Sequence, residues 1–308
     1  MMIFAEGRHS CPICQKAVWC ELSQYASMTF SSSPQEGTVS EWNLYGQKGM
    51  EISMTTLDVR HLKKIYTTRF GASRVQALSN VSFTVEQGEF VAIMGESGSG
   101  KTTLLNILAA LDKPTGGEVL LEGKDIVCMR EKEISAFRRE HLGFVFQDFN
   151  LLDTFSIKDN ILLPLVLSCR SYPEMERRLH SIVQKLEIGE ILSKFPYEVS
   201  GGQKQRAAVA RALITEPRLV LADEPTGALD SRSADELLNL FDDINGEGQT
   251  ILLVTHSIKA ASHAGRVLFI KDGEVFHQIY RGENSTDTLY QKISDTLTLL
   301  ATGGGRYE

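Results

Sequence analysis

The alternation of apolar and polar residues predicts several β-strands around a glycine-rich loop. Residues 54–66 (MTTLDVRHLKKIY) alternate with the two-residue period of a half-buried strand. Residues 77–95 (ALSNVSFTVEQGEFVAIMG) contain two further strand-like runs, which a Gln-Gly pair separates. The second run, 90–94, leads directly into the loop, and residues 101–111 (KTTLLNILAAL) then have helical spacing.

The middle of the chain is mainly helical in pattern. Residues 117–126 (GEVLLEGKDI) read as a strand and a turn, and from about 131 to 217 helical patterns dominate. Within this stretch, residues 173–188 (PEMERRLHSIVQKLEI) begin with Pro173, which suits the first turn of a helix.

Two short apolar runs later in the chain are of the kind that parallel sheets bury. They are residues 218–223 (RLVLAD) and 250–256 (TILLVTH), and a predicted crossover helix, 233–245, lies between them. Residues 266–280 (RVLFIKDGEVFHQIY) predict a hairpin with an Asp-Gly turn. The elements together predict an α/β core with an antiparallel β portion and an inserted helical portion.

The two ends of the chain lack this patterning. Residues 1–53 include the polar stretch SSSPQEGT, and we expect a disordered arm or an artefact of start-site choice, because Met50 and Met54 are candidate starts. The alternative is a genuine extension that binds a partner. The predicted domain covers 54–282, and residues 283–308 are a polar tail with one weak amphipathic run and no assigned role.

Composition adds limits on function. The 308 residues are 42% hydrophobic and carry a net charge of −7, which argues against a protein whose main role is to coat nucleic acid. The longest apolar stretches, such as 161–167, are too short to span a bilayer. No signal segment opens the chain, so the cytosol is the expected location.

The five cysteines pose one question about metal binding. Cys11, Cys14 and Cys20 lie close together, and His9 would complete four ligands for zinc. We favour reduced thiols without zinc, because structural zinc sites usually join two such pairs and no second pair follows.

Residues 95–102 (GESGSGKT) match the phosphate-loop pattern G-x-x-x-x-G-K-[ST] in full. The glycines let the backbone N–H groups face a β-phosphate, Lys101 places its ammonium against the β- and γ-phosphates, and Thr102 offers its hydroxyl to Mg²⁺. The loop lies between a predicted strand and a predicted helix. We therefore expect a P-loop NTPase core that binds a nucleoside triphosphate.

Polar residues follow the predicted buried strands. We expect Asp223 to hold Mg²⁺, directly or through water, and Glu224 to orient or deprotonate the attacking water. His256, after the next strand, would reach the γ-phosphate, and Gln147, after HLGFVF, would touch Mg²⁺ or the water. Each residue alone is also consistent with a surface charge or a structural side chain, and their common sheet edge favours the catalytic interpretation.

A second helix start, VSGGQKQR (199–206), also suits an anion. Ser200 is placed to cap the helix, and the two glycines that follow let an anion approach the backbone at the positive end of the helix dipole. The stretch lies far from the phosphate loop in the sequence.

In this order and spacing the motifs resemble the ATP-binding subunits of ABC transporters over about residues 54–282. They correspond to the Walker A loop, the Q-loop Gln147, the signature VSGGQKQR, the Walker B LVLADE, the D-loop GALD (227–230) and the switch His256. The signature opens with Val199 where leucine is more usual. The resemblance also implies that Tyr66 stacks on adenine, although a partly buried strand tyrosine is the alternative.

The resemblance implies a site completed by two copies that pair head to tail. Glu224, His256 and Gln147 would be catalytic, and Thr102, Gln147 and Asp223 would hold Mg²⁺. The residues implied to bind ATP are Tyr66, Gly95, Glu96, Ser97, Gly98, Ser99, Gly100, Lys101, Thr102, Thr103, Ser200, Gly201, Gly202, Gln203 and Asp230. Ser200, Gly201 and Gly202 would come from the second copy.

Three longer segments, residues 141–165, 222–231 and 264–282, are similar to those of bacitracin-type bacterial exporters. The relatives of these exporters include macrolide-exporting and lipoprotein-releasing ATPases. This implies a separate integral membrane permease, a peripheral location on the cytoplasmic side of the membrane, antimicrobial peptides as substrates and, often, a two-component sensor kinase. Six apolar residues near the Q-loop either form a groove for the permease or pack inside the helical portion. They are Phe146, Phe149, Leu151, Leu152, Phe155 and Ile157.

Two other functions fit these motifs less well. A soluble ABC ATPase that acts on DNA or ribosomes is favoured only by the cysteine cluster, and the acidic balance and single cassette disfavour it. A P-loop kinase would leave SGGQKQR and His256 without a role. We expect no nucleic-acid partner.

Overall fold

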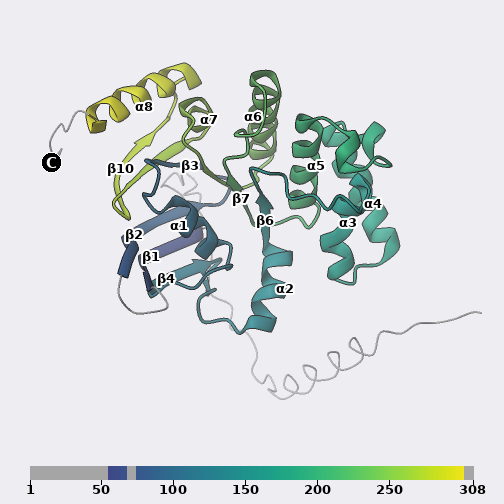
Figure 1. Cartoon of the computed structure of the whole chain (residues 1–308), viewed down its shortest axis with the longest axis horizontal. Coiled ribbons are helices and arrows are strands. Elements are labelled where there is room, and N and C mark those ends of the chain that lie inside the picture. The colour runs from purple at the N-terminus through teal and green to yellow at the C-terminus, as the bar shows by residue number, and fades with distance from the viewer. Residues whose placement is uncertain (1–54, 68–73, 302–308) are drawn as a thin grey trace, which may run out of the picture. The chain divides into compact units, whose positions relative to one another are not determined.

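The computed structural model describes residues 55–67 and 74–301, which form an α/β fold (Figure 1). The possible zinc ligands and the candidate start methionines lie outside the described residues, so the predictions about them stay predictions.

The described residues form one ten-stranded sheet in the order β5-β4-β1-β2-β10-β9-β3-β8-β7-β6. Strands β9, β3, β8, β7 and β6 pair in parallel with one another, and β1, β2, β4 and β5 pair antiparallel with one another. Strand β10 lies between the two groups, antiparallel to β9 and parallel to β2. The strand bounds are β1 Thr55–Thr67, β2 Arg74–Glu86, β3 Phe90–Gly95, β4 Gly116–Leu121, β5 Lys124–Asp125, β6 Leu142–Val145, β7 Leu219–Asp223, β8 Ile251–Val254, β9 Arg266–Lys271 and β10 Glu274–Tyr280.

Some of the helices cover the parallel part of the sheet, and others form a separate group beside it. In Figure 1, α3, α4 and α5 lie together on the side away from β1, β2 and β4. The helix bounds are α1 Lys101–Leu108, α2 Glu131–His141, α3 Ile157–Leu167, α4 Tyr172–Leu186, α5 Gly201–Leu213, α6 Ser231–Gly246, α7 Ile258–Ser262 and α8 Thr286–Ala301, with short 3₁₀ turns η2 Gly189–Ile191 and η3 Pro196–Glu198.

The parallel strands are apolar on both faces and separate two cores. In β3, Val91 and Ile93 pack with α1 and the antiparallel strands, whereas Ala92 and Met94 pack with α3 to α8. Successive side chains of a strand point to opposite faces, so a continuously apolar strand supplies both cores. This explains why runs such as LVLA and ILLV lack polar alternation, and it confirms the predicted α/β architecture.

Strand β6 and helices α7 and α8 were not predicted from the sequence. Strand β6 lies inside the range 131–217, where helical patterns dominate, and it pairs in parallel with β7 at the edge of the sheet. The polar tail contains α8, whose Leu289 and Ile293 are fully buried against the core that also includes α7. Part of the tail therefore belongs to the folded domain.

Within the described residues, no helix combines the length and the apolar character that crossing a membrane requires.

Replacing Leu289 by Ala should lower the free energy of unfolding by about 2–4 kcal/mol, because it removes a fully buried side chain and leaves a cavity. The neighbouring Tyr290 is 43% exposed, and Tyr290→Ala serves as the control. Urea unfolding followed by circular dichroism measures both. Equal losses would mean that α8 does not contribute to the core.

Candidate nucleotide site

The phosphate loop connects β3 to α1 and depends on two glycines. Gly100 has a φ of 100°, and a Cβ there would lie 2.4 Å from the carbonyl oxygen of Ala77. A Cβ on Gly95 would lie 2.2 Å from the carbonyl oxygen of Ile270 on β9. The loop borders a pocket of about 400 Å³ whose lining includes Lys101, Thr102, Glu224 and His256. With Gly95, Ser97, Gly98, Gly100 and Thr103, which also line it, the pocket brings together nine of the predicted site residues.

Lys101 and Asp223 influence one another electrostatically at this pocket. The Lys101 ammonium donates hydrogen bonds to the carbonyl oxygens of Gly95 at 2.7 Å and Glu96 at 2.8 Å. Burial lowers the pKa of Lys101, and the charges of Glu224 and Asp223 oppose that shift. Burial raises the pKa of Asp223, the charge of Glu224 adds to the increase, and Lys101 opposes it. A cation beside Asp223 and Glu224 would relieve their mutual repulsion.

Both oxygens of the Glu224 carboxylate have partners. Thr255 donates from Oγ1 to Oε2 at 2.9 Å, and His256 Nδ1 lies 2.7 Å from Oε1. Thr255 is fully buried, and its backbone N–H bonds to Ile93 of β3. Glu224 itself has a φ of 45°, a left-handed conformation that is rare for a residue other than glycine. The side chain is therefore fixed in direction before any substrate reaches it.

Gln147 lies beyond β6 and contacts the D-loop. A Cβ on Gly227 would lie 3.2 Å from the Gln147 side-chain nitrogen, so the two residues are already close. Because β3, β8, β7 and β6 are successive neighbours in the sheet, their ends carry the phosphate loop, His256, Glu224 and Gln147 in that order. These side chains therefore lie at the carboxyl ends of neighbouring parallel strands, as predicted from the sequence.

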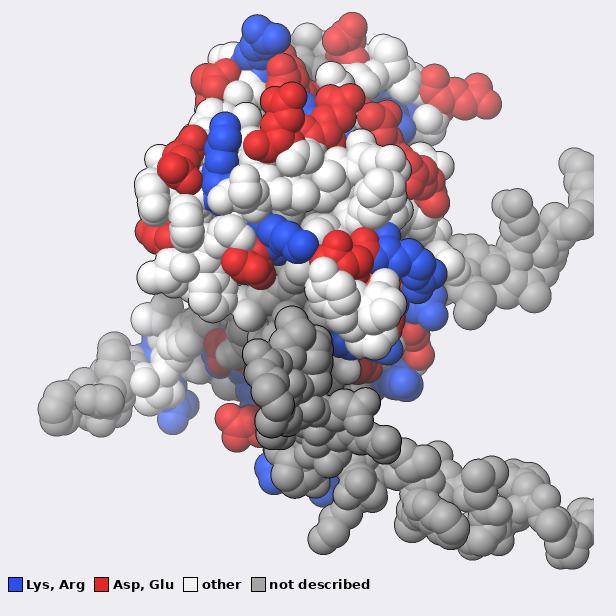
Figure 2. Space-filling model, turned by 90° about the vertical axis from the view of Figure 1, so that its right-hand side faces the viewer, with Lys and Arg blue, Asp and Glu red and all other residues white. Residues whose placement is uncertain are grey.

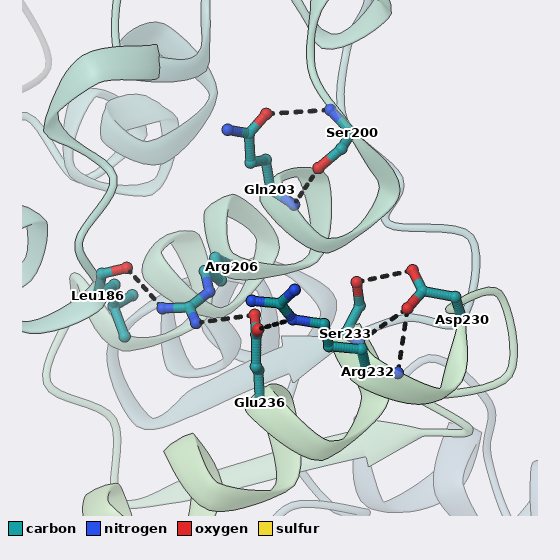
Figure 3. Close-up of polar contacts among 8 residues, drawn as sticks. All are labelled: Leu186, Ser200, Gln203, Arg206, Asp230, Arg232, Ser233 and Glu236. Atoms are coloured by element: carbon teal, nitrogen blue, oxygen red, sulfur yellow. Dashed lines mark hydrogen bonds and ion pairs between the residues drawn. The ribbon is translucent and has the colours of Figure 1, made fainter.

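The signature stretch forms the start of α5. Figure 3 shows the capping box, in which Ser200 Oγ accepts from the Gln203 N–H at 3.3 Å and Gln203 Oε1 accepts from the Ser200 N–H at 3.0 Å. This confirms that Ser200 caps the helix. Ser200, Gly201 and Gly202 are not among the described residues that line the phosphate-loop pocket. Within one chain the start of α5 therefore does not border the phosphate-loop pocket.

The D-loop residue Asp230 caps α6 beside the signature. Its carboxylate accepts hydrogen bonds from the N–H and hydroxyl groups of Ser233 and from the N–H group of Arg232, which hold its pKa below the usual value (Figure 3). The Glu236 carboxylate on α6 accepts hydrogen bonds from Arg206 of α5 at 3.5 Å and from Arg232 at 3.1 Å. The signature helix and the D-loop helix are thus connected side by side.

Tyr66 lies on β1 and is not itself among the described residues that line the pocket. The residue is 42% exposed, and its hydroxyl donates to Asp112 Oδ2 at 2.9 Å. Lys64 bonds the other Asp112 oxygen at 2.6 Å and lies 4.8 Å from the ring centroid. Val75, which pairs with Tyr66 across the strands, does line the pocket. The adenine-stacking role of Tyr66 stays a prediction.

The six apolar residues near the Q-loop divide between the two interpretations, and Phe149 is intermediate in burial. Ile157 is fully buried, Leu151 packs on the core, and the Phe146 ring lies 4.0 Å from that of Phe144. Leu152 and Phe155 are 45% and 39% exposed. The loop that carries them is held by the fully buried Asn160, whose side chain bonds the N–H and C=O of Leu152 and the carbonyls of Phe155 and Ser156.

Sequence reasoning missed two polar residues beside the catalytic edge. Thr255 precedes His256, and a strand ending in Thr-His was the available signal. The other residue, Gln205, is fully buried on α5, and nothing in its sequence position distinguishes it from a helix surface residue.

The fold and the pocket define a P-loop nucleotide-binding protein. Comparison with known proteins gives the family: the model described as "ABC transporter" matches residues 78–227. The chain belongs to the ABC transporter family and is one of its ATPases.

The chain is similar to several members of this family over most of their length. It is 52% identical to the ABC transporter ATP-binding protein YvcR of Bacillus subtilis, over 83% of this chain and 98% of that protein. It is 46% identical to the bacitracin export ATP-binding protein BceA of Halalkalibacterium halodurans, over 80% and 97%. A dimeric post-hydrolysis structure of the cassette MJ0796 bound to ADP and Pi superposes with a TM-score of 0.67 at 38% identity, covering 73% of this chain and 98% of that one.

Gly100→Ala should destabilise the chain more than Gly98→Ala. Both glycines have positive φ, so both variants lose about 1–2 kcal/mol to backbone strain. Only at Gly100 does the new methyl meet another backbone segment, which adds about 1–3 kcal/mol, whereas the space at Gly98 is open. Urea unfolding without nucleotide measures the difference, and equal losses would contradict the close approach of β2.

Proposed function

We propose that two copies of the chain hydrolyse ATP at sites shared head to tail, and that this cycle drives a separate membrane permease. The observation that carries the proposal is the separation of the two anion-binding features. The phosphate-loop pocket is lined by Glu224 and His256, while the capped start of α5 lies outside it. A second copy supplies that helix start to the γ-phosphate, and the MJ0796 dimer supports such pairing.

The donor groups at the pocket suit Mg²⁺. Thr102 lines the pocket, and the half-buried carboxylate of Asp223 lies at the end of β7 next to Glu224. Hydroxyl and carboxylate oxygens are the ligands that Mg²⁺ prefers, so Thr102 and Asp223 would hold it, with Gln147 beside them. The ion would neutralise charge on the phosphates.

Glu224 acts as the general base or as the group that orients the attacking water. Its two partners, Thr255 and His256, hold the carboxylate at the pocket, where a water beside the γ-phosphate comes within reach. His256 is 77% exposed, so its ring is free to leave Glu224 and meet the phosphate. ATP favours the closed pair because α5 binds it only in that state, and product release reopens the pair.

Exposed apolar residues on the helical side support docking to a permease. Leu152 and Phe155 follow the Q-loop, and Val166 and Leu167 at the end of α3 are 53% and 57% exposed. From this side, uncharged side chains form a band across the molecule below a group of acidic residues (Figure 2). Apolar surface of this kind marks interaction sites. The chain would then act as a peripheral protein on the cytoplasmic side of the membrane.

The proposed substrate class is antimicrobial peptides, because the similarity to the bacitracin export protein covers nearly the whole of that relative. A two-component sensor kinase that contacts the same permease is the regulatory partner this class suggests.

Mixing two inactive variants tests the shared site. Glu224→Gln should lower turnover by roughly 10²–10⁴-fold through loss of the base, yet still dimerise with ATP. Ser200→Arg should bind ATP as a monomer but not close. When both are combined before ATP is added, mixed pairs contain one intact site, and phosphate release should partly recover.

Two results would contradict the proposal. Wild-type turnover by Glu224→Gln would remove the role of Glu224. If mixing restores nothing although both variants fold and bind ATP, Ser200 and Glu224 act on one nucleotide from the same chain.

Leu152→Asp should weaken binding to the permease at least tenfold, because burial of such a side chain contributes about 1.5–3 kcal/mol. Leu299→Asp on α8 is the control, since Leu299 is 44% exposed and Leu152 is 45% exposed. Affinity purification from native membranes with mass spectrometry gives the yield of co-purified polytopic protein. Equal yields would exclude this loop from the interface.

A further inference from the structure

Gln205 is a buried amide between two loops of the catalytic edge. It lies one turn into α5, and its side-chain nitrogen donates to the carbonyl oxygens of Phe146 at 3.3 Å and Pro225 at 2.8 Å. The residue is fully buried, and its Oε1 has no hydrogen-bond partner among the described residues. Two carbonyl oxygens face the amide, so its NH₂ group must point to them.

The two carbonyls belong to the neighbours of the proposed catalytic residues. Phe146 immediately precedes Gln147 after β6, and Pro225 immediately follows Glu224 after β7. Because β6 and β7 are paired strands, a single side chain reaches both loops. Gln205 therefore connects the signature helix to the residues on either side of the proposed reaction.

Backbone strain makes the contact at Pro225 important. Glu224 adopts a φ of 45°, and a non-glycine residue keeps such a conformation only where its surroundings hold it. The Glu224 N–H bonds to Val254, and the Glu224 carbonyl accepts from Gly227. The bond from Gln205 to Pro225 fixes the following peptide, so its loss would let the Glu224 carboxylate change direction.

Helix α5 also holds the rest of the Q-loop. Arg211, further along the helix, donates to the carbonyl of Phe149 at 2.8 Å and to that of Asn150. Both of these residues have positive φ. A movement of α5 when its start meets a partner's nucleotide would thus reach the Q-loop and Glu224 together (Figure 3 shows that start).

We infer that Gln205 is a positioning residue that transmits the placement of the signature helix to Glu224 and Gln147. This inference rests on the catalytic roles proposed above. Gln205 contacts no reacting group itself. Its effect on hydrolysis comes from the orientation of the loops that carry Gln147 and Glu224. Binding of ATP by the monomer does not depend on it.

The test compares Gln205→Met with Gln249→Met. Methionine keeps the length of the side chain but removes both donors. Gln249 likewise donates to two carbonyl oxygens, those of Pro217 at 3.1 Å and Thr250 at 3.2 Å. These two residues precede β7 and β8, at the ends of the strands opposite to Glu224 and His256. We expect Gln205→Met to lower kcat by roughly ten- to a hundredfold. KM, the Kd of the monomer for ATP and ATP-driven dimerisation in a Glu224→Gln background should stay within about twofold of wild type.

The inference is overturned if Gln205→Met keeps the kcat of Gln249→Met, or if it loses ATP binding together with turnover. Should Gln205→Met not fold, Gln205→Asn carries the same test, because it keeps an amide that is one methylene too short to reach both carbonyls. Wild-type turnover by Glu224→Gln would instead refute the proposed function. An inactive Glu224→Gln beside an active Gln205→Met would refute only the inference.

Discussion

The structure depends on the burial of a parallel sheet on both faces. Strands β3, β8, β7 and β6 have apolar side chains on either side, so polar residues occur only where the strands end. Asp223, Glu224, Thr255 and His256 all stand at such ends. The same burial that stabilises the domain thus gathers carboxylates beside the phosphate loop, where burial and mutual repulsion raise the pKa of Asp223.

Helix α5 connects this end of the sheet to the rest of the molecule through two kinds of contact. Its small residues, Ala207 to Ala210 among them, pack against the core and let the helix approach β6 closely. Gln205 and Arg211 hold backbone carbonyls of neighbouring loops, while Ser200 leaves the helix start exposed. One end of the helix is therefore available to another chain, and the other end belongs to the interior.

The sequence predicted most of the fold because its strands and glycine loop have strong local signals. It did not predict β6, because LGFV is only four residues long and lies between helical patterns. Helix α8 was not predicted, because the amphipathic run within residues 283–308 is weak and lies in a polar segment. The predicted site residues at strand ends follow from topology, whereas Gln205 could not be recognised, since its partners are carbonyls of residues distant in sequence. The capping role of Asp230 likewise depends on a turn that only the structure defines.

The buried Asn160 affects both the affinity and the rate with which a partner can bind the Leu152–Phe155 loop. Four hydrogen bonds from a fully buried side chain hold this loop against α3. A loop that is already ordered loses little conformational entropy on association, so more of the free energy of burying its apolar side chains remains for affinity. A preformed surface also removes a slow rearrangement from the encounter, which favours rapid association.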